Sequence, residues 1–372
     1  MSFLEQLEKL DTHKSTTLRR FEELLKSDIP LEQLAAQAAL TTRKHFGRTM
    51  RMFAPLYVSN ECVNICKYCG FSRDNPILRV TLDYEQVEAE AQFLISQGFR
   101  SILIVAGEHP KFVSPNYLEE CVRRIRKLVP SVSLEVGPME VEEYRPIVSA
   151  GADGLIVFQE TYDPELYAKL HTAGPKKDFA WRLACPERAY EAGFRRIGLG
   201  ALLGLGEWHK EALALAAHVE YLLKYCWKSH VTVSFPRLRP AAGEFQPLVH
   251  LDEKDLTRLI CSLRIVFPQV GLVMSTRERP KYRDGIAPLG ITLMSAGAHT
   301  EPGGYTGAGK EKLHLTEKGK AVPIIKPEDE NATPQFIIGD NRSTVEVVSR
   351  LKEIGLDPVW KDWEYAFAEN AA

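Results

Sequence analysis

Three cysteines lie close together in the segment NECVNICKYCGFSRD, residues 60–74. Cys62, Cys66 and Cys69 have the spacing C-x3-C-x2-C. Clustered thiolates bind soft metals, and the choice lies mainly between zinc and an iron–sulfur cluster. Structural zinc usually takes four protein ligands, so a triplet without a nearby fourth Cys or His fits it poorly. A [4Fe–4S] cluster held by these three residues would leave one iron without a protein ligand, and that iron can bind a small molecule.

Two other interpretations of the triplet stay open. A zinc-bearing, non-catalytic scaffold on a barrel fold would use the thiols for structure alone. The three positions also share one helical face and could be buried, inert thiols. The neighbouring Asn60, Asn64 and Lys67 argue against a buried apolar helix. The cluster is therefore the favoured hypothesis.

Short apolar segments rich in β-formers alternate with amphipathic helical patterns after residue 47, and these elements must position the cysteines. Helices are predicted over 83–98, 207–225 and 251–267. An open, doubly wound sheet would need a glycine-rich dinucleotide turn after an early strand, and none is present. The alternation therefore favours an α/β fold, a (β/α)8 TIM-type barrel of parallel strands. Its eight predicted strands begin at Phe53, Ser101, Val132, Gly154, Arg195, His230, Val270 and Gly290.

The predicted organisation has three parts: a helical N-terminal extension over 1–47, the barrel over 48–300, and a C-terminal loop and helix over 301–372 that close it. Residues 301–335 are rich in Gly, Pro and Lys and weakly periodic, so we expect them to wrap over the barrel mouth or to move. Ser343 and Glu346 have the spacing of a capping box, which predicts the start of a helix.

The composition excludes several functional classes. The chain has 372 residues, 45% hydrophobic and 26% charged, and a net charge of -2, so nothing indicates binding to nucleic acid or to an anionic membrane. No apolar run approaches the roughly 18 residues that span a bilayer, and the first residues lack the apolar core of a signal peptide. Seven cysteines without an export signal make a disulfide framework unexpected. We expect a cytoplasmic enzyme with reduced thiols.

The cysteine spacing, with the aromatic Tyr68 before the last cysteine, resembles the signature of the radical S-adenosylmethionine (SAM) enzymes. In that family SAM chelates the open iron of a [4Fe–4S] cluster, and one electron from the cluster releases a 5′-deoxyadenosyl radical. The resemblance implies that Cys62, Cys66 and Cys69 bind the cluster. Taken alone, each candidate SAM contact could be a plain turn or a salt bridge. The resemblance implies SAM contacts from Tyr68, Gly107, Glu108, Glu160, Arg182, Ala201 and Leu202.

Further motifs resemble the aromatic amino acid lyases within that family: QETYDPELYAKLHTAGPKKDFAWRL, STRERP and SAGAHTEPGGY. The resemblance extends from about Phe46 to Glu364 and is nearest to the tyrosine lyase branch of bacterial thiamine biosynthesis. It implies cleavage of the tyrosine Cα–Cβ bond to dehydroglycine and p-cresol, with Arg277 on the substrate carboxylate and Ser295 near its amino group. It also implies two protein partners, a reductant such as flavodoxin or ferredoxin and a thiazole synthase.

Two related lyases need separate treatment. The hydrogenase-maturation tyrosine lyase carries a second cluster in a cysteine-bearing C-terminal domain, whereas the last cysteine here is Cys261. The tryptophan lyase of peptide-antibiotic pathways stays open as an alternative, because one sequence does not identify the residues that select phenol over indole. Arg237, Arg239 and Arg279 are predicted at the mouth beside Arg277, where guanidinium groups suit a carboxylate ligand, although any of them could be a solvated loop residue.

Overall fold

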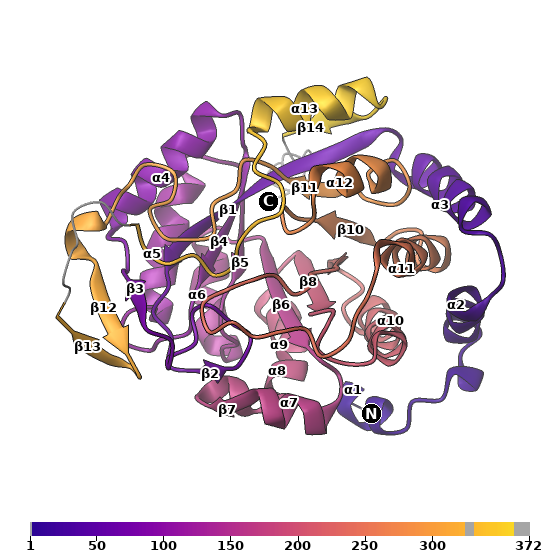
Figure 1. The fold of residues 1–372 in the computed structure, drawn as a ribbon, viewed down its shortest axis with the longest axis horizontal. Coiled ribbons are helices and arrows are strands. Elements are labelled where there is room, and N and C mark those ends of the chain that lie inside the picture. Colours follow the sequence, from indigo (N-terminus) through magenta and orange to yellow (C-terminus); the bar gives the residue numbers. More distant parts are fainter. Residues whose placement is uncertain (1, 324–330, 361–372) are drawn as a thin grey trace.

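Eight parallel strands form a closed barrel in this computed structural model, which describes residues 2–323 and 331–360 (Figure 1). Strand β11 pairs with β1 and thereby closes the sheet. The predicted (β/α)8 barrel is confirmed, although the last strand begins at Leu293 and not at Gly290. The strands, in order around the barrel, are β1 Thr49–Ser59, β4 Ser101–Ala106, β5 Ser131–Glu135, β6 Gly154–Glu160, β8 Arg196–Ala201, β9 His230–Ser234, β10 Gly271–Met274 and β11 Leu293–Ser295.

Helices connect the strands and cover the outside of the barrel (Figure 1). The predicted helices over 83–98, 207–225 and 251–267 are confirmed as α4, α10 and α11. Each buries an apolar face on the sheet, and every fully buried large apolar side chain contributes about 1.5–3 kcal/mol. The helices are α4 Tyr84–Ser96, α5 Pro115–Arg126, α6 Val141–Ser149, α7 Pro164–Leu170, α8 Phe179–Leu183, α9 Cys185–Ala192, α10 Trp208–Tyr225, α11 Glu253–Val266 and α12 Pro280–Ile286.

The N-terminal residues form helices that pack against the outside of the barrel. Helices α2 and α3 contact α11, and α2 also contacts α10. Phe3 stacks on His218 of α10 with 4.2 Å between the ring centroids. Residues 27–30 separate α2 from α3. These elements are α1 Phe3–Glu8, η1 Thr12–Lys14, α2 Thr16–Lys26 and α3 Leu31–Phe46.

The segment over 301–335 contains a short β-hairpin that its weak periodicity did not reveal. Strand β12 (His314–Glu317) pairs with β13 (Lys320–Val322) and with β3 (Ile77–Arg79), which follows the cysteine segment. A three-residue strand at a sheet edge carries too little alternation to be recognised in a sequence. Part of the segment, 324–330, lies outside the described residues, and its movement stays a prediction.

The chain then returns to the barrel. Helix α13 (Thr344–Glu353) begins with the predicted capping box of Ser343 and Glu346, which is confirmed. Strand β14 (Asp357–Val359) pairs with the first residues of β1, outside the closed barrel. The proposed boundaries of the three parts stay a prediction.

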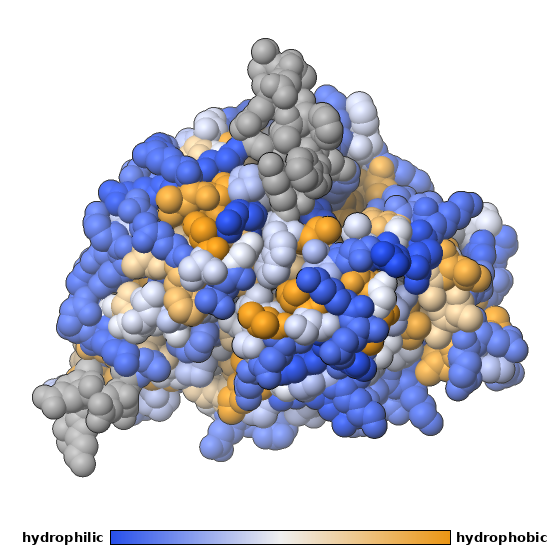
Figure 2. All heavy atoms as spheres, turned by 90° about the horizontal axis from the view of Figure 1, so that it is seen from above, coloured by the Kyte–Doolittle hydropathy of each residue, from blue (hydrophilic) through white to orange (hydrophobic). Residues whose placement is uncertain are grey.

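The surface carries hydrophobic residues in separate patches among hydrophilic ones, on the face that Figure 2 shows. Within residues 2–323 and 331–360, no helix is long and apolar enough to cross a membrane.

Candidate active site

A central cavity extends along the barrel interior to its mouth. Inward-facing side chains of the strands line it, among them Phe53 of β1 and Phe158 of β6. Across the barrel the lining residues are small, such as Gly198 of β8 and Thr232 of β9. Small residues leave the interior less filled than the layered core of an ordinary barrel. This barrel therefore has room for a ligand at the carboxyl ends of its strands.

The three cysteines line a second cavity at the same mouth. Cys66 lies in a short strand, β2 (Ile65–Cys66), which pairs with β7 (His171–Ala173). The guanidinium group of Arg79, 2% exposed, donates hydrogen bonds to the carbonyl groups of Asn60, Phe71 and Ser72. Arg79 thus fixes both ends of the cysteine loop, a role that sequence reasoning missed because an arginine in a short strand usually faces solvent.

The donor set fits a cluster better than a single zinc ion. Burial raises the pKa of the Cys66 and Cys69 thiols, and the nearby Lys176 ammonium opposes this shift. The thiolates therefore need further positive charge, which an iron–sulfur core supplies. In the described part of the chain, no three Cys, His, Asp or Glu side chains are grouped to hold one metal ion. A cubane cluster spreads its thiolates over separate irons, whereas zinc gathers them on one ion.

Gly107 and Glu108 follow β4 and face the cysteine loop. Asn64 donates a hydrogen bond from Nδ2 to Oε2 of Glu108 at 2.7 Å. A Cβ atom at position 107 would lie 2.2 Å from the carbonyl oxygen of Glu61, so this close approach requires glycine. Both residues line the cavity with the cysteines, and their contact with SAM stays a prediction.

Glu160 ends β6 between two buried cations. Lys176 Nζ lies 2.6 Å and Arg182 Nη2 lies 3.6 Å from its Oε1 atom. Burial raises the pKa of the Glu160 carboxyl, but the two cations more than offset this, so the pKa is lowered. Its φ of 72° is left-handed, a conformation that costs a non-glycine residue about 1 kcal/mol or more. Lys176 was missed, because "GPKKD" has the composition of a solvated turn.

The remaining predicted SAM contacts divide into two groups. Tyr68 and Leu202 line a third cavity beside Cys69, and the Tyr68 hydroxyl lies 2.8 Å from Nε2 of His171. Ala201 is 1% exposed and packs in the barrel core, where it pairs with Glu160. The structure therefore brings Tyr68 and Leu202 to the mouth and places Ala201 in the wall behind them.

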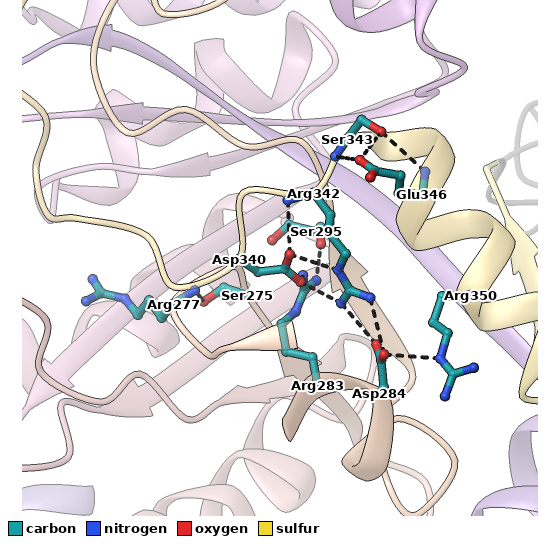
Figure 3. Close-up of polar contacts among 10 residues, drawn as sticks. All are labelled: Ser275, Arg277, Arg283, Asp284, Ser295, Asp340, Arg342, Ser343, Glu346 and Arg350. Atoms are coloured by element: carbon teal, nitrogen blue, oxygen red, sulfur yellow. Dashed lines mark hydrogen bonds and ion pairs between the residues drawn. The ribbon is translucent and has the colours of Figure 1, made fainter. Parts of the chain in front are cut away.

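Arg277 and Ser295 line the central cavity, on the side of β10 and β11. Figure 3 shows Arg277 extending away from the polar network around Arg283. The Arg277 guanidinium stacks on Phe336, with 3.4 Å from Cζ to the ring centroid. Burial lowers the pKa of Arg277, and no carboxylate among the described residues forms an ion pair with it. A carboxylate ligand would complement this charge.

The other arginines predicted at the mouth have different surroundings. Arg237 forms a two-pronged pair with Glu278, with 2.8 Å from Nε to Oε1. Arg279 pairs with Glu253 and is 60% exposed. Arg239 is half-buried at the rim. Of the four, Arg277 is the cation that lines the central cavity and has no carboxylate partner among the described residues, which the sequence pattern did not distinguish.

A fully buried ion pair holds the backbone of Ser295 (Figure 3). Arg283 of α12 binds both the carboxylate of Asp340 and the carbonyl oxygen of Ser295. Arg342 adds contacts of 2.7 Å to Asp340 and 3.0 Å to Asp284. The segment before α13 is thereby tied to the end of β11. Sequence reasoning identified only the helix cap in this segment.

Replacing Asp340 by alanine is expected to lower the free energy of unfolding by about 3–5 kcal/mol, because it leaves the Arg283 charge buried without its partner. Urea unfolding followed by circular dichroism measures the change. Asp357→Ala is the matched control: it removes an exposed pair with Arg48 and should cost about 1 kcal/mol or less. Equal stability of the two variants would contradict a structural role for the buried pair.

Comparisons with known proteins agree with this arrangement. A family model described as "Radical SAM superfamily" matches residues 56–219, and one described as "Biotin and Thiamin Synthesis associated domain" matches residues 234–357. The chain is 40% identical to the 2-iminoacetate synthases of Salmonella typhimurium and Escherichia coli over 335 residues, which cover 90% of this chain and 83% of each relative.

Solved structures are also similar. The [FeFe]-hydrogenase maturase HydG from Carboxydothermus hydrogenoformans is 33% identical, with a TM-score of 0.81 over 96% of this chain and 79% of that chain. Methylornithine synthase (PylB) shares the fold at 21% identity, with a TM-score of 0.71 and full coverage of both chains.

Proposed function

Because the chain belongs to the 2-iminoacetate synthase family of radical SAM enzymes, we propose that it cleaves the Cα–Cβ bond of tyrosine to 2-iminoacetate and p-cresol. It is a radical SAM carbon–carbon lyase. The observation that carries an amino acid substrate is Arg277, which has no carboxylate partner among the described residues and lines a cavity that adjoins the cysteine site; the 2-iminoacetate synthase relatives favour tyrosine.

In the proposed holoenzyme Cys62, Cys66 and Cys69 bind a [4Fe–4S] cluster. When bound, the cluster and SAM together supply a 5′-deoxyadenosyl radical. Membership of the family supports both cofactors. The chain contributes the polar groups around them: Glu108 on the cysteine side, and Glu160 with its cations on the side of β6.

The chain orients the substrate through the central cavity. The planar guanidinium of Arg277 suits two parallel hydrogen bonds to the tyrosine carboxylate, and Phe336 holds that guanidinium by stacking. The proposed role of Ser295, which lines the same cavity, is to contact the amino group through its hydroxyl. The aromatic Phe53 and Phe158 line the same space and exclude water from a reactive radical.

The proposed protein partners follow from this chemistry. SAM cleavage needs a one-electron reductant, such as flavodoxin or ferredoxin. The imine product hydrolyses readily, so direct transfer to a thiazole synthase would protect it. A cytoplasmic location stays a prediction.

Anaerobic turnover of the reconstituted enzyme with SAM, a reductant and one amino acid tests the proposal. We expect p-cresol from tyrosine. 3-Methylindolic acid from tryptophan would instead support the tryptophan lyase alternative. Iron and sulfide analysis addresses the scaffold alternative, since a cluster brings about four of each per chain. A colourless protein with about one zinc would contradict the proposed enzyme.

A further inference from the structure

Glu135 is the last residue of β5 and faces the space that joins the two main cavities. It lines the central cavity with Arg277 and also the cavity with the cysteines. In the parallel pairing Glu135 lies opposite Val105 of β4, which lies opposite Tyr57 of β1. Glu135 and Tyr57 thus belong to one inward-facing layer of the barrel.

The other carboxylates that line these cavities already have partners. Glu108 accepts a hydrogen bond from Asn64. Glu160 pairs with Lys176, and Glu278 pairs with Arg237.

Glu135 differs from these three carboxylates. It has no hydrogen-bond donor and no ion pair within residues 2–323 and 331–360. No histidine in that part of the chain lines either cavity. Glu135 is therefore the carboxylate that remains available to exchange a proton with a ligand.

The surroundings of Glu135 bring its titration close to neutral pH. Burial raises the pKa of the carboxyl to about 7, and the positive charge of Arg277 limits the rise. A group whose pKa lies near the working pH is suited to accept a proton and to release it again. The other charged or titratable groups that face it are Tyr57 on β1, Glu160 on β6, Lys176 on the turn after β7 and Arg182 on α8.

We propose that Glu135 is the catalytic base that removes a proton from the ammonium group of bound tyrosine. The inference rests on the proposed function. An amino acid arrives as a zwitterion, and its two charges match the Arg277 cation and the Glu135 anion that share the cavity. The ammonium nitrogen must also lose protons, because the product is a neutral imine.

The proton transfer balances without any further reagent. The Glu135 carboxylate forms an O–H bond, and one N–H bond of the ammonium group breaks. The electron pair of that bond stays on nitrogen as the lone pair of the amine, so no electron leaves the substrate. Protonated Glu135 returns the proton to solvent when the products leave.

The test is Glu135→Gln, which keeps the size of the side chain but cannot accept the proton. Initial rates of p-cresol formation by the reconstituted holoenzyme are measured across pH at saturating SAM. At pH 7 we expect kcat for the variant to fall about a hundredfold, with a much smaller change in KM for tyrosine. With rising pH the variant should recover about tenfold per pH unit, because solution then supplies the free amine.

The wild-type pH profile should have a different shape. Its activity should fall as the pH drops below about 7, because the protonated form of Glu135 accepts no proton. The wild-type activity should level off above about pH 7, whereas the activity of the glutamine variant should continue to rise toward the pKa of the substrate amine. Glu187→Gln is the matched control: burial also raises the pKa of Glu187, which lies on α9 and lines neither cavity, so its profile should match the wild type.

Two results would overturn the inference. One is a glutamine variant with wild-type activity at pH 7. The other is a folded, SAM-binding variant whose loss of activity is the same at every pH, because a purely structural role gives no recovery with pH. A wild-type enzyme that forms no p-cresol contradicts the proposed function itself, and the variant is not needed to see that outcome.

Discussion

Replacing Cys66 by alanine is expected to abolish the reductive cleavage of SAM and to leave the barrel folded. Cys66 is 4% exposed and lies on a two-residue strand outside the barrel, so its loss removes one thiolate and little packing. Two cysteines cannot hold three corners of a cubane cluster. Anaerobic assays of 5′-deoxyadenosine formation measure the effect, and far-UV circular dichroism monitors the fold.

The control for this variant is Cys261→Ala. Cys261 is buried in α11, in an apolar cluster with residues of α3, and its substitution removes a thiol of similar burial away from the mouth. This variant should keep its iron and its SAM cleavage. Deoxyadenosine production by the Cys66 variant at the wild-type rate would contradict the cluster assignment.

Replacing Arg277 by glutamine is expected to lower kcat/KM for tyrosine about a thousandfold. Loss of one partner from a desolvated charge pair costs about 2–5 kcal/mol, and each 1.36 kcal/mol is a factor of ten. Because Arg277 stacks on Phe336 and lines the cavity, its replacement by glutamine leaves the substrate carboxylate without a compensating charge. Steady-state kinetics with varied tyrosine measure the loss.

Arg279→Gln is the matched control from the same turn. Arg279 is exposed and pairs with Glu253, so its loss should change kcat/KM by less than about threefold. SAM binding should be similar in both variants, because Arg277 is proposed to act on the amino acid. Equal losses in the two variants would contradict the placement of the substrate carboxylate.

The strands and the cysteine site could be predicted because their signals are local. A buried strand between two helices is visible as a short apolar run, and three cysteines with one spacing define one loop. The capping box at Ser343 is also a relation between near neighbours. The hairpin β12–β13 was missed because its strands are short and only partly buried.

The partners of individual charges could not be predicted in the same way. Arg237, Arg277 and Arg279 lie in similar arginine-rich turns. Nevertheless, Arg237 pairs with Glu278, Arg277 faces the central cavity and Arg279 is exposed. Glu135 has the sequence context of an ordinary strand residue, and only the joining of two cavities beside it indicates a chemical role.

The sequence by itself determined the alternation of strands and helices that forms the barrel. It also determined the three closely spaced cysteines that suit a cluster. Both features depend on residues near one another in the chain. Only the tertiary structure decided which cations are neutralised and which carboxylate stays available. Asp340 reaches Arg283 across 57 positions, and Lys176 reaches Glu160 across 16. Burial and pairing of charges arise from such long-range contacts, and these set the electrostatics of the site.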